Sequence, residues 1–301
     1  LLTEDSYFKE NKDAKITIEI EDFDLFQTML CGQCFHFEVI DDERIALVAG
    51  GRLVVARQPQ SGTLILQDMT IEEYDTYFRH YFDLDRDYAS IKSRLLSEDE
   101  LLKTSIESMN GVRILNQDYL ETLISFIISQ NKQIPHIKKI VAGISKEYGE
   151  YVGSVGDMHF YSFPDVDEIK KITEDGLREL KTGFRAPYIM DAIECYLDGR
   201  ISEKELREST TDECIDKLMQ IKGVGSKVAN CVALFSLEKR DAFPVDVWIK
   251  RIMENMYFHG DTKKEIIEEF AKKKYGEYGG YAQQYLFFYG RENGIGKNDK
   301  K

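Results

Sequence analysis

IKGVGSKVAN, residues 221–230, is the stretch that decides the fold, because two glycines and a lysine lead into an apolar helical run. Gly223 and Gly225 permit positive φ and the close approach of another backbone. A turn of this kind, followed by the first turn of a helix, leaves main-chain amides unpaired, and a phosphate is their natural partner. A plain corner between two helices has the same pattern, so the stretch alone leaves both interpretations open.

A second stretch, AFPVDVWIKRI (242–252), places Asp246 where a helix N-cap belongs. The predicted helix over 226–237 carries the chain about 16 Å away from the hairpin. The segment 238–245 can then span about 26 Å when extended. That reach is enough to bring Asp246 back to the end of the helix where Lys227 lies. An amine and a carboxylate can therefore share one cleft.

Lys227 occupies the first turn of this predicted helix. A lysine is a nucleophile only when it is deprotonated, and the positive end of a helix disfavours the ammonium form. The position is therefore suited to a reactive amine. The simpler alternatives are a solvated lysine at a helix start and, for Asp246, a carboxylate that only caps its helix.

Composition indicates a folded chain with an unusual charge balance for a phosphate-binding protein. The 301 residues are 43% hydrophobic, enough for one large domain or two to three small ones. The net charge of −14 argues against a nucleic-acid partner. Binding is local, however, and residues 218–260 hold six Lys or Arg against four Asp or Glu. The acidity gathers instead in residues 71–87, 97–100 and 203–216.

The five cysteines are odd in number, so a disulfide framework is not expected. Cys31-Gly-Gln-Cys34 is interpreted as two buried thiols beside a strand, since a single CxxC is a weak zinc signal. No apolar run approaches the ~20 residues of a membrane span. The first 15 residues are charged and polar, unlike a secretory signal, and a cytoplasmic protein without membrane contact is expected.

The pattern of apolar residues changes from strand-like to helical near residue 70. Alternation predicts strands over residues 15–21 and 34–40, a further strand follows over 62–68, and two apolar runs around Gly50-Gly51 predict a hairpin over 47–55. Short consecutive strands of this kind pair into an antiparallel sheet. Helices are predicted over 71–82, 88–96, 117–129, 135–148, 166–172, 186–197, 211–220, 226–237, 247–257, 263–274 and 280–289. The fold class is therefore α+β, with a sheet module and flanking helices in residues 1–100 and a mostly helical body in 101–301. The polar end, 291–301, is expected to fray.

The stretch LMQIKGVGSKVANCVALFSLEKRDAFPVDVWIKRI resembles the helix-hairpin-helix motif and catalytic aspartate loop (212–252) of base-excision DNA glycosylases. Four further segments resemble the 8-oxoguanine DNA glycosylases within that superfamily: LCGQCFHF (30–37), GVRILNQDYLETLISFIISQN (111–131), GFRAPY (183–188) and GGYAQQYLFF (279–288). The resemblance covers nearly the whole chain. It implies a bifunctional enzyme that excises 8-oxoguanine from duplex DNA and cleaves the abasic strand by β-elimination, acting as a monomer without a required cofactor.

The resemblance also implies roles for single residues. Lys227 matches the nucleophile that attacks the sugar C1′ and forms a Schiff base, and Asp246 matches the aspartate that stabilises the developing positive charge. In the base site, the carbonyl of Gly32 would accept the N7–H that 8-oxoguanine has and guanine lacks. The flipped base would lie between Cys231 and Phe287. The side chain of Gln283 would hydrogen-bond the pairing edge of the base.

A second group of residues matches the DNA-contacting positions of the family. Asn131 would fill the space that the base leaves, Phe184 would wedge against the opposite base, and Arg185 would contact that base. His136 stands where well-known relatives have a second arginine that selects cytosine. Trp248 stands where they have a histidine near the phosphate. We therefore expect relaxed discrimination of the opposite base.

The hairpin itself matches the backbone grip of the family. Gly223, Val224 and Gly225 would hold the DNA backbone through amides. The main-chain carbonyls of Ile221 and Val224 would bind a structural monovalent or divalent cation. Two other interpretations remain at this stage. One is a glycosylase for alkylated purines, although such enzymes generally activate water and lack the hairpin lysine. The other is a non-catalytic DNA-binding module.

Overall fold

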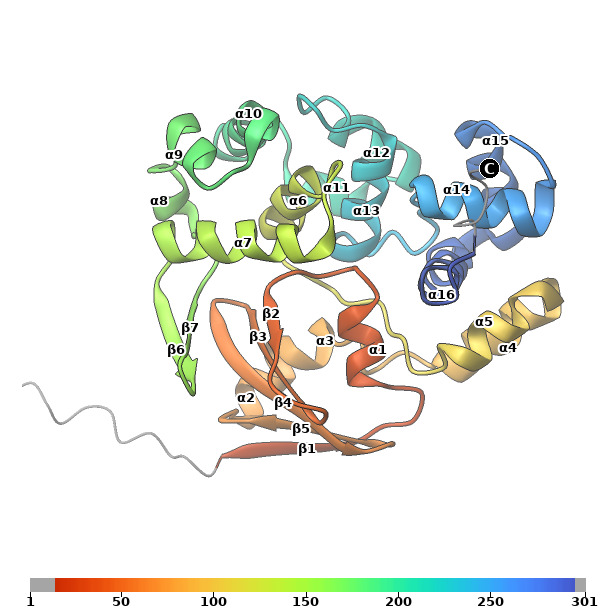
Figure 1. The fold of residues 1–301 in the computed structure, drawn as a ribbon, viewed down its shortest axis with the longest axis horizontal. Coiled ribbons are helices and arrows are strands. Elements are labelled where there is room, and N and C mark those ends of the chain that lie inside the picture. Colours follow the sequence, from red (N-terminus) through yellow and green to blue (C-terminus); the bar gives the residue numbers. More distant parts are fainter. Residues whose placement is uncertain (1–13, 296–301) are drawn as a thin grey trace, which may run out of the picture.

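The computed structural model describes residues 14–295, and it confirms an α+β fold in which an antiparallel sheet precedes a helical body (Figure 1). Residues 1–13, most of the stretch interpreted as unlike a secretory signal, lie outside the described residues. Residues 296–301, the last part of the polar end that is expected to fray, also lie outside them. Within them, no helix is both long enough and apolar enough to cross a bilayer.

The five strands pair in the order β1–β5–β4–β3–β2, every pair antiparallel. Their bounds are β1 Lys15–Glu19, β2 Phe37–Val39, β3 Arg44–Ala49, β4 Arg52–Gln60 and β5 Thr63–Gln67. One face of the sheet packs on its own core with α1 (Leu25–Leu30). The sequence prediction missed α1, which is too short to show a helical period and begins at the N-cap Asp24.

Helices follow from residue 71, as predicted. The first group comprises α2 Ile71–Glu73, a π-helical turn Tyr74–Phe78, α3 Arg79–Tyr81, α4 Tyr88–Glu98, a 3₁₀ turn Glu100–Leu102, α5 Lys103–Ser108, α6 Tyr119–Ile128 and α7 Ile134–Tyr148. After a two-stranded hairpin, β6 Tyr151–Val155 and β7 Met158–Tyr161, come α8 Val166–Ile169, α9 Glu174–Glu179, a 3₁₀ turn Gly183–Arg185, α10 Ala186–Leu197 and α11 Glu203–Glu208. The last group comprises α12 Thr211–Leu218, α13 Ser226–Ser236, α14 Val247–Met253, a π-helical turn Glu254–Phe258, α15 Lys264–Tyr275, a 3₁₀ turn Gly276–Tyr278 and α16 Gly279–Glu292.

The β6–β7 hairpin was not predicted from the sequence. It hangs from the end of α7 beside the sheet (Figure 1), where Phe160 packs against Ala46 and Val48. This packing joins segments more than 100 residues apart. The local sequence pattern therefore gave little indication of the hairpin. The short helices α5, α9 and α11 were missed for the same reason.

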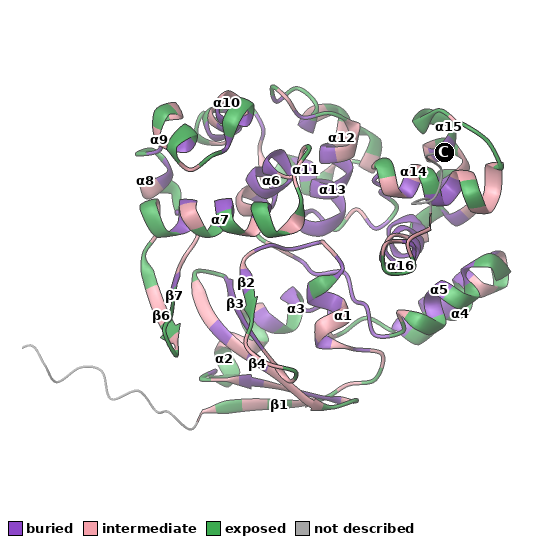
Figure 2. Cartoon of the chain, in the orientation of Figure 1, coloured by how far each residue is buried: buried purple, intermediate pink, exposed green. Residues whose placement is uncertain are grey.

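Two helices, α6 and α13, form the buried centre of the helical body (Figure 2). They pack against each other, and the ring of Phe126 stacks on that of Phe235 with centroids 5.5 Å apart and 17° between planes. The apolar side chains of α4 join this core rather than the core of the sheet. The consequence for the site is that the end of α6 lies beside the start of α13.

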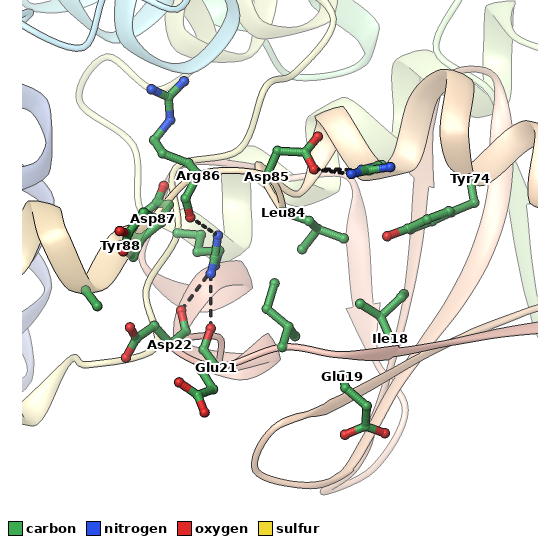
Figure 3. Close-up of a pocket in the computed structure, with 14 residues that line it drawn as sticks. Ile18, Glu19, Glu21, Asp22, Tyr74, Leu84, Asp85, Arg86, Asp87 and Tyr88 are labelled. Carbon is green, nitrogen blue, oxygen red and sulfur yellow. Dashed lines mark hydrogen bonds and ion pairs between the residues drawn. The ribbon is translucent and has the colours of Figure 1, made fainter.

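Arg113 ties the sheet to the helical body. Its side chain is buried, 3% exposed, and its guanidinium lies 4.4 Å from the centroid of the Tyr88 ring. It donates to the main-chain carbonyls of Glu21 (3.0 Å), Asp22 (3.1 Å), Asp83 (2.7 Å) and Arg86 (3.1 Å). Figure 3 shows Glu21, Asp22 and Arg86 around a cavity of about 390 Å³. None of the predicted site residues lines this cavity, so Arg113 acts here as a structural joint.

Candidate active site

The hairpin between α12 and α13 depends on one glycine. Gly223 has φ of +81°, and a Cβ added there would lie 2.3 Å from the ring of Tyr188. Gly225 differs: its φ is −99°, it caps α13, and nothing lies within 4 Å of an added Cβ. The expectation of a positive φ is therefore wrong for Gly225, because an N-cap residue takes an extended conformation.

The hairpin presents main-chain amides with no partner. Within residues 14–295, the amides of Gly225, Ser226 and Lys227 make no hydrogen bond, whereas that of Lys222 donates to Asp191 Oδ2 at 2.7 Å. The three amides lie at the positive end of α13. This is the arrangement of a helix N-terminus that binds an anion.

The Lys227 side chain is half-buried beside the end of α6. Its Nζ donates to Ser129 Oγ at 3.0 Å and lies 5.1 Å from the centroid of the Phe126 ring. In the part of the chain that the structure describes, Lys227 makes no ion pair within 4 Å. Sequence reasoning missed Ser129, although it lies in a segment that carried the family resemblance. Only its place at the predicted end of a helix could have drawn attention to it.

Asp246 returns to the same region, as the chain geometry predicted. It is half-buried and caps α14, with Oδ1 accepting from Ile249 N at 2.8 Å. The Cys231 thiol is close to both Asp246 and Lys227. Burial raises the pKa of the Cys231 thiol to about 11, with the Lys227 amine acting against that rise and the Asp246 carboxylate adding to it. The amine and the carboxylate thus both lie within electrostatic reach of one buried thiol.

Helix α16 brings a buried amide to the other side of the site. Gln283 is 5% exposed, its Nε2 donates to Pro244 O at 3.4 Å, and its buried Oε1 has no partner among the described residues. Gln283 is therefore a buried amide and not a surface one. Phe287, one turn further, is half-buried, and its Cε1 would lie 3.3 Å from a Cβ added to Gly32.

The CxxC motif lies directly against this part of α16. Cys31 and Cys34 are buried free thiols, as the sequence predicted, and burial raises the pKa of Cys31 to about 12. Gln284 Nε2 donates to Cys31 Sγ at 3.5 Å, which holds the turn that carries Gly32. No cluster of three or more His, Cys, Asp or Glu that could hold a metal ion is found between residues 14 and 295.

Three predicted DNA-contacting side chains, those of Asn131, His136 and Phe184, lie on the surface. Asn131 is exposed and adopts a positive φ of 52°, and Phe184 is 51% exposed. His136 is exposed in the first turn of α7. Trp248 lies in the first turn of α14, half-buried, with the guanidinium of Arg251 5.6 Å from its ring centroid. Their roles on DNA stay predictions.

Arg185 is buried rather than presented to a partner. It is 3% exposed, and its Nε donates to Gln130 O at 2.8 Å and its Nη1 to Thr182 O at 3.1 Å. Gln130 Nε2 in turn donates to Gly223 O at 3.2 Å. In this structure Arg185 therefore supports the turn that carries Asn131. A contact with the opposite base requires its hydrogen bonds to rearrange.

Comparison with known proteins agrees with this geometry. The 8-oxoguanine DNA glycosylase N-terminal domain matches residues 15–123, and the HhH-GPD superfamily base excision DNA repair protein matches residues 124–276. The chain belongs to the 8-oxoguanine DNA glycosylase family of the HhH-GPD superfamily. The expected family is thus confirmed, and the hairpin and aspartate loop both lie in the second matched range.

Individual members of this family are similar along nearly their full length. The crystal structure of a Clostridium acetobutylicum 8-oxoguanine glycosylase/lyase, bound to DNA with cytosine opposite 8-oxoguanine, superposes with a TM-score of 0.90 at 37% identity, covering 94% of this chain and 97% of that one. A probable N-glycosylase/DNA lyase of Methanothermobacter thermautotrophicus is 28% identical (92% and 96% covered). An N-glycosylase/DNA lyase of Saccharomyces cerevisiae is 26% identical (92% and 85% covered).

The two hairpin glycines should respond differently to the same substitution. Gly223→Ala should lower the free energy of unfolding by at least about 2 kcal/mol and weaken DNA binding, because the methyl group meets Tyr188 at a positive φ. Gly225→Ala is the matched control and should change the free energy of unfolding by no more than about 1 kcal/mol. Urea unfolding and binding to a short duplex measure both; equal losses in the two variants would contradict the assignment.

Proposed function

We propose that this glycosylase excises 8-oxoguanine from duplex DNA and then cleaves the abasic strand through a Schiff base on Lys227. The observation that carries the proposal is the position of this amine. It lies at the amide-rich start of α13, bonded to Ser129, and shares the neighbour Cys231 with Asp246. The similarity to a glycosylase/lyase whose structure holds 8-oxoguanine DNA supports the same substrate.

The residues present account for each step of the chemistry. The neutral amine of Lys227 attacks C1′ of the sugar, and the bond from C1′ to the base nitrogen breaks with its electron pair leaving on the base. The Asp246 carboxylate stabilises the positive charge that develops on the sugar. The imine formed after ring opening acidifies the C2′ hydrogens, so that β-elimination expels the 3′ phosphate. Asp246 remains in place throughout because its helix cap anchors it.

The base site contains an acceptor that has no partner. A buried carbonyl without a hydrogen bond costs free energy, and the N–H groups on the pairing edge of a guanine would satisfy Gln283 Oε1. The carbonyl of Gly32 would accept N7–H, the donor that oxidation adds. Cys231 and Phe287 would contact the two faces of the base. The unpartnered amide oxygen favours a substrate with donors at this edge.

The grip on the DNA backbone would come from the free amides of the hairpin. Such contacts need no positive side chain, so binding is compatible with the net charge of −14. A cation would fit the hairpin carbonyls, because Val224 O has no partner among the described residues and Ile221 O accepts a single bond, from Val224 N at 3.0 Å. The chemistry itself needs no cofactor. A monomer in the cytoplasm is the proposed state.

Changing the two reacting groups should separate chemistry from binding and folding. Lys227→Gln should abolish excision, lowering the single-turnover rate by at least about 1,000-fold, while the affinity for an 8-oxoguanine duplex stays within about threefold. Asp246→Asn keeps the N-cap, since asparagine caps as well as aspartate, and should lower the rate by about 100-fold or more with little change in the melting temperature.

The control for this pair is Lys222→Gln, which removes the amine of a neighbouring exposed lysine. The main-chain amide of Lys222, which donates to Asp191, is kept in this variant. It should retain the excision rate. Full excision by Lys227→Gln would point to an enzyme that activates water. Intact DNA binding without excision in the unchanged enzyme would point to a binding module.

This chain has His136 where well-known relatives have an arginine, and we expect this difference to relax the choice of the opposite base. Excision of 8-oxoguanine paired with C, A, G or T should differ by no more than about tenfold in the unchanged enzyme, because a neutral imidazole reads a base edge less specifically than a guanidinium. His136→Arg should shift the preference toward C. Single-turnover rates on the four duplexes measure this, and a strong preference for C without the substitution would contradict it.

A further inference from the structure

We infer that the Ser129 hydroxyl is a positioning group that aims the Lys227 amine at the sugar carbon, a role that rests on the proposed Schiff-base reaction. Ser129 is the C-cap residue of α6, and its Oγ lies 3.0 Å from Lys227 Nζ. The two residues are 98 positions apart in the chain. The contact therefore exists only because the end of α6 meets the start of α13.

The direction of the hydrogen bond is fixed by a second contact. Ser129 Oγ donates its hydrogen to Phe126 O at 2.7 Å. The lone pairs of the hydroxyl are then left to accept from the lysine. A main-chain carbonyl is not a base, so the serine cannot pass a proton onward. Its contribution is the orientation of the amine, and the hydroxyl is unchanged by the reaction.

The surroundings of Nζ restrict where its lone pair can point. A neutral amine carries one carbon, two hydrogens and one lone pair. One N–H is directed at Ser129, the buried Cys231 thiol is a second neighbour, and the Phe126 ring lies on a third side, 5.1 Å away. With these directions taken, the lone pair faces away from α6. Orientation of this kind contributes strongly to the rate of a nucleophilic attack.

The aromatic residues beneath the serine are buried and in contact with one another. Phe126 stacks on Phe235 of α13 and meets Phe35 edge-on, with centroids 5.5 Å apart in both pairs. The Ser129 amide donates to Ser125 O at 3.0 Å, which closes the last turn of α6. The serine and the lysine are thus mounted on two helices whose buried faces pack directly on each other.

In the attack, the bond from Nζ to C1′ forms while the bond from C1′ to the base nitrogen breaks, and the electron pair leaves with the base. The amine nitrogen then loses one proton, which balances the charge on the departing base. A misaligned amine would attack more slowly. Water would then compete for the sugar and give an abasic product with no covalent intermediate. The ratio of covalent adduct to simple abasic product therefore reports the orientation of the amine.

The test compares Ser129→Ala with Ser129→Thr, which keeps the hydroxyl, and with Ser129→Cys, a weaker acceptor of similar size. The matched control is Ser236→Ala in α13, because its buried Oγ also donates to a main-chain carbonyl at 2.7 Å, that of Val232, and makes no contact with Lys227. Borohydride trapping and single-turnover excision are measured on an 8-oxoguanine duplex. Affinity is measured on a duplex with a tetrahydrofuran abasic analogue, which cannot form an imine.

Ser129→Ala should slow covalent trapping by about 10- to 100-fold and raise the share of untrapped abasic product, with affinity and melting temperature close to those of the unchanged enzyme. Ser129→Thr should restore most of the rate, and Ser129→Cys should be intermediate. Trapping at the normal rate in Ser129→Ala, or a loss shared equally by Ser236→Ala, would overturn the inference. If the unchanged enzyme forms no adduct at all, the proposed function fails and not merely the role of Ser129.

Discussion

The packing of α13 against α6 is the constraint on which the site depends. Both helices are buried along most of their length, and the stacked rings of Phe126 and Phe235 set how one lies on the other. Lys227, the proposed nucleophile, and the free amides of the hairpin lie together at the start of α13, and this contact brings Ser129 at the end of α6 beside them. Asp246 and α16 are then added from the C-terminal part of the chain. A shift between the two helices would separate the Lys227 amine from Ser129, whereas the free amides of residues 225–227 would move together with the amine.

The proposed contacts of the hairpin with DNA use main-chain amides, so they are compatible with the acidic composition of the chain. The amides of Gly225, Ser226 and Lys227 carry the partial positive charge of a helix N-terminus whatever the sum of the side chains. The net charge of −14 arises outside residues 218–260, which hold six Lys or Arg against four Asp or Glu. A long-range repulsion of DNA remains, and it falls with added salt. In the proposed complex, the amides of the hairpin decide where the duplex binds.

Sequence reasoning was most successful where function follows from short spacings. The hairpin, the N-cap at Asp246 and the helical pair Gln283 and Phe287 depend on residues within one turn of each other, so their placement could be worked out before the structure. The antiparallel sheet was likewise visible in its alternation. The free amides of the hairpin agree with the predicted phosphate site, and phosphate binding itself stays a prediction.

What the sequence could not show depends on distant contacts. The bond from Lys227 to Ser129 joins residues that no pattern connects. Arg185 was expected at the opposite base, yet its guanidinium is buried against Gln130 and Thr182, and burial of a charged group depends on the surrounding tertiary structure. The β6–β7 hairpin was missed because its residues are stabilised by the sheet. Gly225 was misjudged because the sequence does not distinguish a glycine that needs positive φ from one that caps a helix.

The most direct test of this account is to locate the covalent bond to DNA. The unchanged enzyme is treated with borohydride during turnover of an 8-oxoguanine duplex, and the cross-linked peptide is identified by mass spectrometry. The account predicts a reduced sugar adduct on Lys227, in the peptide that contains residues 221–230. An adduct on another lysine or on the N-terminal amine would contradict the central claim, as would excision of the base with no adduct at any position.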